Sequence, residues 1–470
     1  MSARQTDPMS PLDPTAADPF YRQIYERFRS AINSGLLKPG DRIPSARALT
    51  KELGLARGTI DTAYSLLAAE GYIQARGQAG TIVTPGLRAP VASAAPAPDS
   101  APATSFRPDS ILPFQMGLPA LDEFPRKIWA RLGARCVRAM QPADMAHPSV
   151  YGLPDLRAEI AAYLQVSRGI SCAPSQVFIT AGYRHTVELI SHALLKAGDK
   201  VWLEDPGYPP TRELLAHLQM AAVPVPVDGE GMVVAAGIKA APKARAAVVT
   251  PAHQSPLCVS LSLPRRQQLL DWAARNKAWI IEDDYDGEYR YVSRPLPALK
   301  SLDRDGRVLY AGTFSKVLFP GIRLAYLVVP QDQVQRFEQV SQVFAAGSPA
   351  LTQAIVTAFI KEGHFARHIQ RMRKLYAERR DATTAGLESV LAKHVRIDPL
   401  PGGMHLILRL QGTQSDRRLV ARMRKDGLYG EALTDWAIDG GSASAVLLNF
   451  TNIDSQRTAE KFGERILKLI

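Results

Sequence analysis

Short apolar runs alternate with helical patterns along most of this chain, from about residue 111 onward. Such alternation is typical of a parallel-sheet α/β domain, in which helices cover strands that are buried on both faces. The runs that predict strands are QVFITAG from Gln176, KVWLEDP from Lys200, AAVVTP from Ala246, AWIIEDD from Ala278 and RVLYAG from Arg307.

The C-terminal part of the chain has a different pattern. After Pro330 the apolar spacing becomes helical and stays so through Ala377. Two later apolar runs, residues 406–410 and 446–450, predict strands of a smaller C-terminal subdomain. The fold class predicted for residues 111–470 is therefore α/β, with a small C-terminal subdomain.

Residues 18–85 form a separate block in which helical patterns are punctuated by turn signals. Apolar residues recur at helix spacing from Tyr21 to Ile32, and GLLKPGD then breaks the chain. Ser45 is placed to cap a helix over residues 46–53. A second helix begins near Arg57.

This second helix has the features of a DNA-recognition helix. Its first turn carries Arg57 and Thr59, where side chains can enter the major groove. Tyr64, Leu66 and Leu67 are expected to pack inward, against the rest of the block. The block thus has the outline of a winged helix-turn-helix.

A glycine-bearing hairpin after this helix predicts the wing. The predicted wing consists of Arg76, Gly77, Gly80 and Thr81. Its tight turn needs glycine, and Arg76 can reach a phosphate or the minor groove. Periodicity alone also fits a small helical bundle with surface arginines.

Residues 86–110 separate the two blocks and differ from both in composition. The segment from Gly86 to Ser105 is mostly Ala, Pro, Ser and Thr, with too little apolar bulk to offset the entropy of folding. Its prolines favour extended geometry, so it reaches up to roughly 60 Å. It is a predicted linker, long enough to pass over a neighbouring subunit.

Composition narrows the class of protein. The chain has 470 residues, of which 46% are hydrophobic and 22% charged, as in ordinary soluble proteins of two or more domains. Its apolar runs are too short to cross a bilayer and its start lacks an apolar signal core, so a cytoplasmic protein is expected. A formal net charge of +12 favours polyanionic partners. The three cysteines include no CxxC pair, which argues against disulfides or a zinc ribbon, and no metal site is predicted.

The segment AGTFSKVLFPGIR, residues 311–323, has the spacing of a covalent cofactor site. It presents hydroxyl groups, on Thr313 and Ser315, just before the amine of Lys316. Lys316 can form a Schiff base with an aldehyde, and Arg323 can clamp a phosphate. A phosphorylated aldehyde such as pyridoxal phosphate fits this set better than a nucleotide does. The local pattern alone also fits an ordinary strand end followed by an exposed lysine.

The segment AWIIEDDYDGEYRY carries acids at the end of another predicted strand, which is where open α/β sheets bind ligands. The carboxylate of Asp283 can pair with a pyridine nitrogen and keep it protonated, and the phenol of Tyr285 can hydrogen-bond a ring oxygen. A solvated acidic turn and a magnesium site are the alternatives, but the preceding AWII is a buried strand and no phosphate loop accompanies it.

A phosphate site is predicted in FITAGYRH. Gly182 opens a helix whose free amides can bind a phosphate, and Tyr183 and Arg184 lie nearby. Such a turn is weak support when it stands alone.

Two loops offer contacts to a flat ring. In LEDPGYPP, Tyr208 follows a strand and a turn, a position suited to stacking on the ring. In VVTPAHQSPLCVS, His253 and Gln254 offer polar contacts to the ring-oxygen side. Plain structural loop residues are the alternative in both places.

The run LKPGDRIPSARALTKELGLARGTIDTAYSLLAAEGYI closely resembles the DNA-binding domain of the GntR family of regulators. The resemblance implies double-stranded DNA as a partner. A bidentate arginine contact to guanine contributes about 1 to 3 kcal/mol of discrimination, so Arg47 and Arg57 are expected to read bases. The residues that the resemblance puts at or near the DNA are Arg42, Ser45, Arg47, Arg57, Thr59 and Gly80.

The segments around Lys316, in their order along the chain, resemble fold-type I aminotransferases. Their tandem with the N-terminal block resembles the MocR subfamily of GntR regulators. The resemblance implies pyridoxal 5'-phosphate as the cofactor and a head-to-tail homodimer whose DNA-binding domains cross to the partner subunit. The roles it implies are Lys316 in the aldimine, Asp283 at the pyridine nitrogen, Tyr285 and His253 near the ring hydroxyl, Tyr208 stacked on the ring, and Ser315 and Arg323 at the phosphate.

Some positions depart from the aminotransferase pattern. In AVLLNFTNI, Leu447 or Leu448 stands where an arginine that clamps the substrate α-carboxylate is expected. Arg409 is either a substitute clamp or a strand-edge surface residue. His147 lies near the usual place of the tyrosine that crosses to the partner's phosphate, and Cys258 stands where glycine is common.

The function predicted from these features is a pyridoxal phosphate-dependent, DNA-binding transcriptional regulator. It senses a small amine, an amino acid or the cofactor itself through an aldimine at Lys316. It is not expected to be an enzyme, although a residual transaminase half-reaction is compatible with the residues. One alternative is an active aminotransferase with an accessory DNA-binding domain. The other is a DNA-binding protein whose large domain only dimerises.

Overall fold

The computed structural model of this chain divides into two compact units, Met1–Arg107 and Pro108–Ile470. It describes residues 12–16, 18–77, 80–87, 111–146, 149–291, 297–344, 347–398, 402–438 and 443–470. The predicted linker lies outside these residues except for its first two. None of the helices in the described ranges combines the length and apolar character that a bilayer crossing needs. The same ranges contain no group of three or more His, Cys, Asp or Glu that could hold a metal ion.

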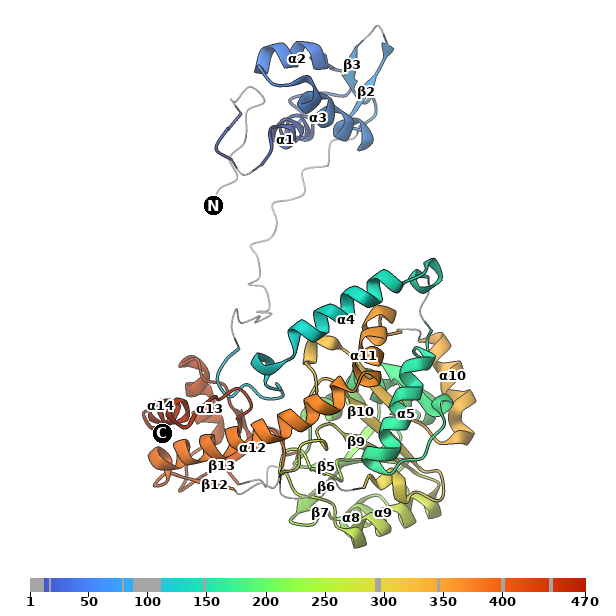
Figure 1. Ribbon diagram of the computed structural model, residues 1–470, viewed down its shortest axis with the longest axis vertical. Coiled ribbons are helices and arrows are strands. Elements are labelled where there is room, and N and C mark those ends of the chain that lie inside the picture. Colours follow the sequence, from blue (N-terminus) through green and yellow to red (C-terminus); the bar gives the residue numbers. More distant parts are fainter. Residues whose placement is uncertain are drawn as a thin grey trace. The chain divides into compact units, whose positions relative to one another are not determined.

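The N-terminal unit packs three helices beside a small antiparallel sheet with the strand order β1-β3-β2 (Figure 1). Its elements are α1 (Phe20–Asn33), β1 (Arg42–Ile43), α2 (Ala46–Leu53), α3 (Arg57–Ala69), β2 (Ile73–Ala75) and β3 (Thr81–Val83). The β2–β3 hairpin is the predicted wing. A winged helix-turn-helix is therefore confirmed for this unit.

The core of this unit follows from helical periodicity. On α3, Ile60, Tyr64 and Leu67 are buried at a spacing that puts them on one stripe. Leu66 is 38% exposed, so the prediction that it packs inward is wrong. At about 100° per residue Leu66 falls well off that stripe, and Leu67 takes the inward position instead.

The large unit is built on an eight-stranded sheet with the order β4-β11-β10-β9-β8-β5-β6-β7. The pairs from β10 to β6 are all parallel, whereas β11 runs antiparallel between β10 and β4. The five predicted strands are present as β4, β5, β8, β9 and β10. The strands are β4 (Val177–Thr180), β5 (Lys200–Asp205), β6 (Ala221–Asp228), β7 (Gly231–Met232), β8 (Ala246–Val249), β9 (Trp279–Asp284), β10 (Val308–Thr313) and β11 (Ala325–Val328).

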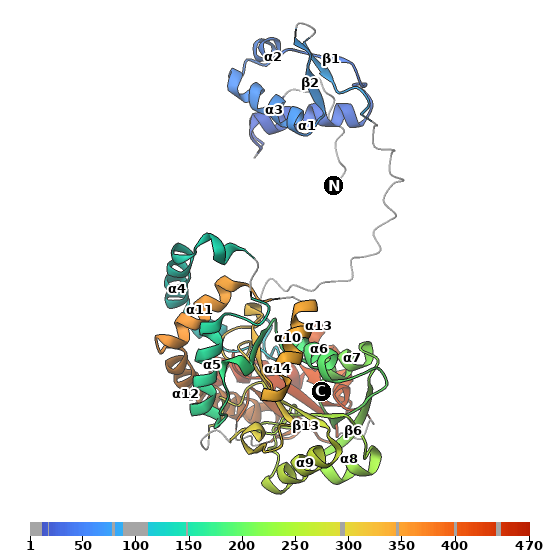
Figure 2. The ribbon, with the colours of Figure 1, turned by 90° about the vertical axis from the view of Figure 1, so that its right-hand side faces the viewer.

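Helices cover both faces of this sheet (Figures 1 and 2). On β4, Val177 and Ile179 join one apolar cluster while Phe178 joins another, as the two-residue period of a strand requires. The covering helices are α4 (Arg126–Ala139), α5 (Pro154–Arg168), α6 (Tyr183–Leu194), α7 (Pro209–His217), α8 (Val234–Ala240), α9 (Leu263–Asn276), α10 (Val334–Val343) and α11 (Ala350–Lys361).

A smaller C-terminal subdomain follows the long helix α12 (His364–Leu391), which runs from the large sheet toward it (Figure 1). Its sheet has the order β12-β13-β15-β14, with all pairs antiparallel. The predicted strands at 406–410 and 446–450 are present as β13 and β15. Its elements are β12 (Val395–Ile397), β13 (His405–Leu410), α13 (Asp416–Lys425), β14 (Glu431–Ala432), β15 (Ala445–Asn449) and α14 (Gln456–Leu467).

A buried ionic network ties α5 to the end of β9, to the loop that follows it and to the middle of β10. Nε of Arg168 donates to Oδ2 of Asp284 at 2.5 Å, and a second guanidinium nitrogen lies 2.8 Å from Oε1 of Glu288. Hydroxyl groups of Tyr310 and Tyr163 complete the shell, at 2.6 Å from Asp284 and 2.8 Å from Glu288. The three charged side chains are at least 93% buried, because their exposed fractions are 2, 3 and 7%. The network stabilises the loop that follows β9.

Replacement of Arg168 tests this role. In Arg168→Met, two carboxylates lose their counter-ion inside the protein, so the large unit is expected to lose about 3 to 5 kcal/mol of unfolding free energy. Urea unfolding followed by circular dichroism measures the loss. The control is Arg275→Ala, which removes an exposed pair with Asp271 and should cost less than about 0.5 kcal/mol. Equal losses in the two variants would contradict the assigned role.

Candidate functional site

A cavity of about 330 Å³ lies at the carboxyl ends of the parallel strands in the large unit. It takes residues from both the large sheet and the C-terminal subdomain. Nine of the ten residues predicted for the cofactor line it, and His253 is the exception. The lining residues are Met116, Gly117, Gly182, Tyr183, Arg184, Tyr208, Ser255, Asp283, Tyr285, Asp286, Thr313, Ser315, Lys316, Pro320, Arg323, Met404, His405, Glu431 and Trp436.

Lys316 lies just beyond the end of β10, with its amine inside the cavity wall. Its Nζ donates to the carbonyl oxygen of Gly117 at 2.9 Å. Gly117 has φ 77°, and a Cβ there would come within 2.6 Å of Nζ, so a larger residue would displace the amine. Burial lowers the pKa of Lys316, against the opposing effect of nearby carboxylates. A larger fraction of its amine is therefore neutral, and nucleophilic, than in an ordinary lysine.

Asp283 lies on β9, next to β10, and faces the cavity. The two-residue period of the strand turns Asp284 to the opposite face, where Arg168 holds it. Burial raises the pKa of Asp283 well above its ordinary value, and neighbouring acids act in the same direction. Its carboxyl has no hydrogen-bond partner among the residues that the structure describes. A cation in the cavity would keep this acid ionised.

The start of α6 and Arg323 form a positively charged end of the cavity. Gly182 precedes the helix at φ 117°, a conformation that favours glycine, and a Cβ there would lie 3.6 Å from the Arg323 guanidinium. The guanidinium therefore lies beside Gly182, at the start of α6. The hydroxyl groups of Thr313 and Ser315 line the same cavity. Such a set binds a phosphate.

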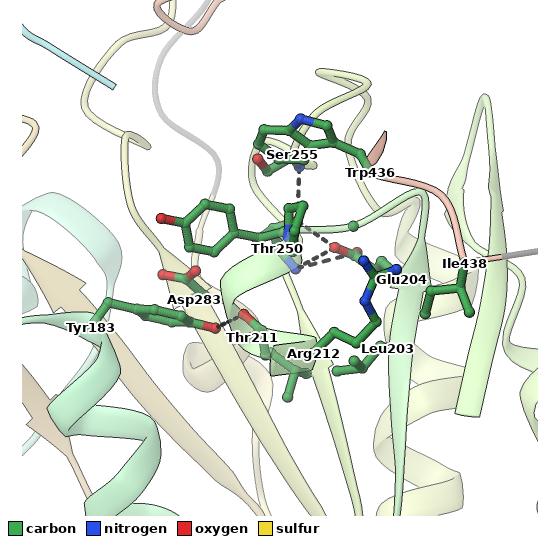
Figure 3. Close-up of a pocket in the computed structure, with 14 residues that line it drawn as sticks. Tyr183, Leu203, Glu204, Thr211, Arg212, Thr250, Ser255, Asp283, Trp436 and Ile438 are labelled. Carbon is green, nitrogen blue, oxygen red and sulfur yellow. Dashed lines mark hydrogen bonds between the residues drawn. The ribbon is translucent and has the colours of Figure 1, made fainter. Parts of the chain in front are cut away.

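Aromatic side chains line a second part of the site. A small pocket of about 30 Å³ adjoins the cavity and shares Tyr183, Tyr208, Asp283 and Trp436 with it (Figure 3). Tyr183 donates to or accepts from Thr211 at 2.8 Å. Tyr208 is 42% exposed, with its ring centroid 5.9 Å from that of Tyr183 and 5.7 Å from that of Trp436. Its ring is accessible for stacking.

Arg184 lies at the rim of the cavity. Its side chain is 61% exposed and lies 3.8 Å from Glu213 on α7. Helices α6 and α7, which carry this pair, lie side by side (Figure 2). Arg184 is thus open to solvent, unlike Lys316.

His253 lies behind the cavity wall rather than in it. Its Nδ1 is 3.0 Å from Oδ1 of Asp286 and 3.1 Å from the hydroxyl of Tyr285, and both partners line the cavity. Burial acts to lower the pKa of His253, but the Asp286 carboxylate raises it well above its ordinary value. His253 therefore holds Tyr285 from behind.

The prediction that Gln254 contacts the ring-oxygen side is wrong. Its side-chain nitrogen donates to the carbonyl oxygens of Pro206 and Ser255, at 2.9 and 2.8 Å, and Leu257 donates to its oxygen. These bonds hold the loop together. The next residue, Ser255, lines the cavity instead.

Several lining residues were not predicted. Ser255 follows the predicted His253–Gln254 pair, so its loop was identified but the residue was not. Most of the others come from the segment before α4 or from the C-terminal subdomain, both far from Lys316 in the sequence. The rest lie beside a motif but were not part of its predicted set. No local sequence pattern identifies any of them as cavity residues. They are Met116, Gly117, Asp286, Pro320, Met404, His405, Glu431 and Trp436.

The structure describes most of the residues that depart from the aminotransferase pattern. Leu447 is fully buried in β15. Arg409 lies outside the cavity lining, near the end of the inner strand β13, where its Nε donates to Oδ2 of Asp398 at 2.6 Å. Cys258 has φ 61°, the left-handed conformation that explains why glycine is common there. His147 lies outside the described residues.

The predicted DNA-contacting arginines are exposed on the N-terminal unit. Arg42 lies on β1 and Arg47 on α2, and both are exposed. The side chain of Arg57, at the start of α3, is 75% exposed and lies 3.5 Å from Asp61. Arg76 is exposed at the turn of the wing, directly after β2. All four are available to phosphates or bases.

Ser45 and Gly80 have structural roles beside these arginines. The hydroxyl of Ser45 accepts from the amide of Ala48, which confirms the predicted cap of α2. Thr59 lies half-buried in the first turn of α3. Gly80 has φ 84°, and its carbonyl accepts from the amide of Arg76 at 2.8 Å, which closes the wing.

The residues present in the cavity fit pyridoxal phosphate. Asp283 is a buried acid that lacks a hydrogen-bond partner among the described residues. A protonated pyridine nitrogen would supply that partner. The start of α6 with Arg323 suits a phosphate, and Lys316 supplies a primary amine within the same cavity. No other charged cofactor group is needed to account for these side chains.

Two family models match the chain, one in each unit. Bacterial regulatory proteins of the gntR family match residues 20–83, and aminotransferases of class I and II match residues 121–435. The solved structure of an archaeal alanine:glyoxylate aminotransferase has a TM-score of 0.71 and 26% identity, covering 77% of this chain and 90% of that one. The α-aminoadipate aminotransferase LysN of Thermus thermophilus, complexed with N-(5'-phosphopyridoxyl)-L-leucine, has a TM-score of 0.68 and 27% identity, covering 77% and 94%. The predicted fold-type I architecture is confirmed.

Relatives match across both units together. The probable rhizopine catabolism regulatory protein MocR of Rhizobium meliloti is 35% identical over 463 residues, covering 96% of this chain and 93% of that protein. The pyridoxine biosynthesis transcriptional regulator PdxR of Corynebacterium glutamicum is 32% identical, covering 95% and 94%. With both units matched in one continuous alignment, this chain belongs to the MocR-type GntR family of transcriptional regulators, whose DNA-binding domain is joined to an aminotransferase class I and II domain.

Proposed function

We propose that this regulator binds pyridoxal 5'-phosphate covalently on Lys316 and uses the site to sense a small amine, an amino acid or the cofactor itself. The observation that supports this best is the cavity in which the half-buried Lys316 amine and the buried Asp283 carboxyl meet a phosphate-binding end. When bound, the cofactor supplies an aldehyde that condenses reversibly with primary amines. The regulator then acts on DNA in the cytoplasm.

The side chains of the cavity divide the binding task. Asp283 pairs with the pyridine nitrogen, and the phenol of Tyr285, held by His253, donates to the ring oxygen. Tyr208 covers the face of the ring. The cofactor's phosphate is bound by Ser315, by Arg323 and by the backbone amides that follow Gly182 at the start of α6. Tyr183 and Arg184 lie at the border of this phosphate site.

The DNA contacts are assigned to the exposed residues of the N-terminal unit. Arg47 and Arg57 read bases, whereas Arg42 and Arg76 bind phosphates. Two such units on a head-to-tail homodimer would engage two half-sites, which are easiest to span at whole helical turns of about 34 Å. The support for the dimer is the family resemblance.

Two features of the C-terminal subdomain favour a sensing function over a catalytic one. Fold-type I aminotransferases clamp the substrate α-carboxylate with an arginine, and at that place this chain has Leu447 or Leu448, both fully buried. Leu447 packs with Trp436, which lines the cavity, whereas Leu448 packs into the core of the subdomain. The candidate substitute, Arg409, is engaged with Asp398. The effector then changes DNA affinity through its differential affinity for two arrangements of the chain.

Substitution of the recognition arginines tests the DNA interface. A DNA duplex is first selected by the full-length protein from a random-sequence pool. Arg57→Ala and Arg47→Ala should each reduce the preference for that duplex over a scrambled one about 5- to 150-fold, because a bidentate base contact is lost. Fluorescence anisotropy at fixed salt measures both affinities. Arg22→Ala, an exposed charge on α1, should leave the preference unchanged, and an unchanged preference in Arg57→Ala and Arg47→Ala would refute the assignment.

Coupling between the two units tests the sensing proposal. Titration of the loaded protein with a panel of amines and amino acids should identify a compound that changes both the cofactor absorption spectrum and the affinity for the selected duplex. Lys316→Ala should abolish both responses. If the active compounds change only the spectrum, and an added 2-oxo acid gives sustained amino transfer, the protein is an aminotransferase and the sensing proposal fails.

A further inference from the structure

One face of the small C-terminal sheet borders the cavity. His405 on β13 and Glu431 on β14 both line the cavity. Glu431 lies directly opposite Leu447 on β15, and Leu447 lies opposite Ile407 on β13. Residues opposite one another in antiparallel strands share a face, with Cβ atoms roughly 4.5 to 5.5 Å apart. Leu447 and Glu431 therefore occupy the same cavity-side corner.

The Leu447 half of this corner is apolar. Leu447 is fully buried and packs in one cluster with Ile407, Leu433 and Trp436, against which Met116 lies. Met116 and Trp436 line the cavity themselves. A carboxylate placed in this corner would lose its water without gaining a cation.

The Glu431 half carries a negative charge that the described residues leave unpaired. The indole Nε1 of Trp436 donates to Oε2 of Glu431 at 3.0 Å, and the hydroxyl of Tyr429 donates to Oε1 at 3.2 Å. Both donors are neutral, so they fix the direction of the carboxylate without neutralising it. Glu431 makes no ion pair with any residue in the described ranges.

The two other acids of the cavity and its phosphate-binding groups have partners once the cofactor is bound. Arg323 and the start of α6 serve the phosphate, Asp283 serves the pyridine nitrogen, and Asp286 is paired with His253. Glu431 is the acid left over for the effector. It is also near enough to Lys316 to act on the titration of that amine.

We propose that Glu431 and Leu447 select effector amines that carry a second positive charge in place of a carboxylate, such as short linear diamines. A primary amine of the effector would replace the Lys316 Nζ on the cofactor carbon, with Lys316 released as a free amine, and the second ammonium of the effector would bind the Glu431 carboxylate. The inference rests on the proposed function, because it requires effector amines to reach the cofactor at Lys316. It adds the chemical class of the effector.

Three probes of equal chain length test the selection. Full-length protein loaded with pyridoxal phosphate is titrated with 1,4-diaminobutane, with 4-aminobutanoate and with butan-1-amine, and the cofactor absorption spectrum reports half-saturation. The probes differ only in the distal group, which is an ammonium, a carboxylate or a methyl. Half-saturation by 1,4-diaminobutane is expected at a concentration about 10- to 100-fold lower than by the other two, the range for a charge-assisted hydrogen bond.

Two variants assign the preference to this corner. Glu431→Gln should raise the half-saturating concentration of 1,4-diaminobutane at least about tenfold and leave butan-1-amine unchanged, which also shows that the variant is folded and loaded. Leu447→Arg should shift the preference toward 4-aminobutanoate. Glu388→Gln, an exposed acid on α12, is the matched control and should change nothing.

The outcomes separate this inference from the proposed function. If all three amines change the spectrum equally, or if Glu431→Gln retains the preference, the selection by Glu431 is refuted while the sensing site survives. If 4-aminobutanoate is preferred, the inference is refuted in the same way. If neither these three probes nor any compound of the wider panel changes the spectrum of the loaded protein, both the sensing function and the inference fail.

Discussion

A single buried arginine holds together the parts of the structure on which the site depends. Arg168, at the end of α5, binds Asp284 and Glu288, while the hydroxyl of Tyr310 binds Asp284 from the neighbouring strand. Since successive residues of a strand face opposite sides, anchoring Asp284 in the helical layer turns Asp283 toward the cavity. Tyr310 belongs to β10, the strand that leads to Lys316. The same network therefore aligns the acid and the amine that the proposed cofactor requires.

The charged side chains of the cavity lie in different parts of it, according to their sign and the element that carries them. Its positive end lies at the start of α6 with Arg323, and its acid for a ring nitrogen is Asp283 on β9. A third charge, Glu431, comes from the C-terminal subdomain, whose sheet forms the opposite wall. In the proposed function, the large sheet would hold the groups that recognise the cofactor, and the small sheet would hold the groups that meet the effector. This division explains how one type of cofactor site can serve different effectors.

Much of the fold was predictable because apolar runs followed by turn signals mark buried parallel strands. Strand β6, which was missed, lacks these marks. Pro224 and Pro226 interrupt β6, and a proline argues against a strand unless the strand lies near a sheet edge, as β6 does beside the two-residue β7. Strand β11 lies in LAYLVVP, an apolar run that ends at Pro330 as the predicted runs end at their turn signals, but it was not assigned to a strand.

The candidate site was predictable where a motif follows a strand. Lys316, Asp283 and Arg323 belong to such motifs, and all three line the cavity. Glu431 and Trp436 could not be identified in this way, because they reach the cavity from a subdomain built by distant segments. Gln254 shows the opposite error, in which a residue is predicted for the site but does not belong to it. Its side chain makes hydrogen bonds to its own loop rather than to a ligand.

The measurement that tests the account most directly is peptide mapping of the borohydride-treated protein. Full-length protein is saturated with pyridoxal 5'-phosphate, treated with borohydride to make the attachment permanent, digested and analysed by mass spectrometry. The account predicts the phosphopyridoxyl mass on the peptide that contains Lys316 and on no other lysine at comparable yield. An unmodified Lys316 in protein saturated with the cofactor would contradict it.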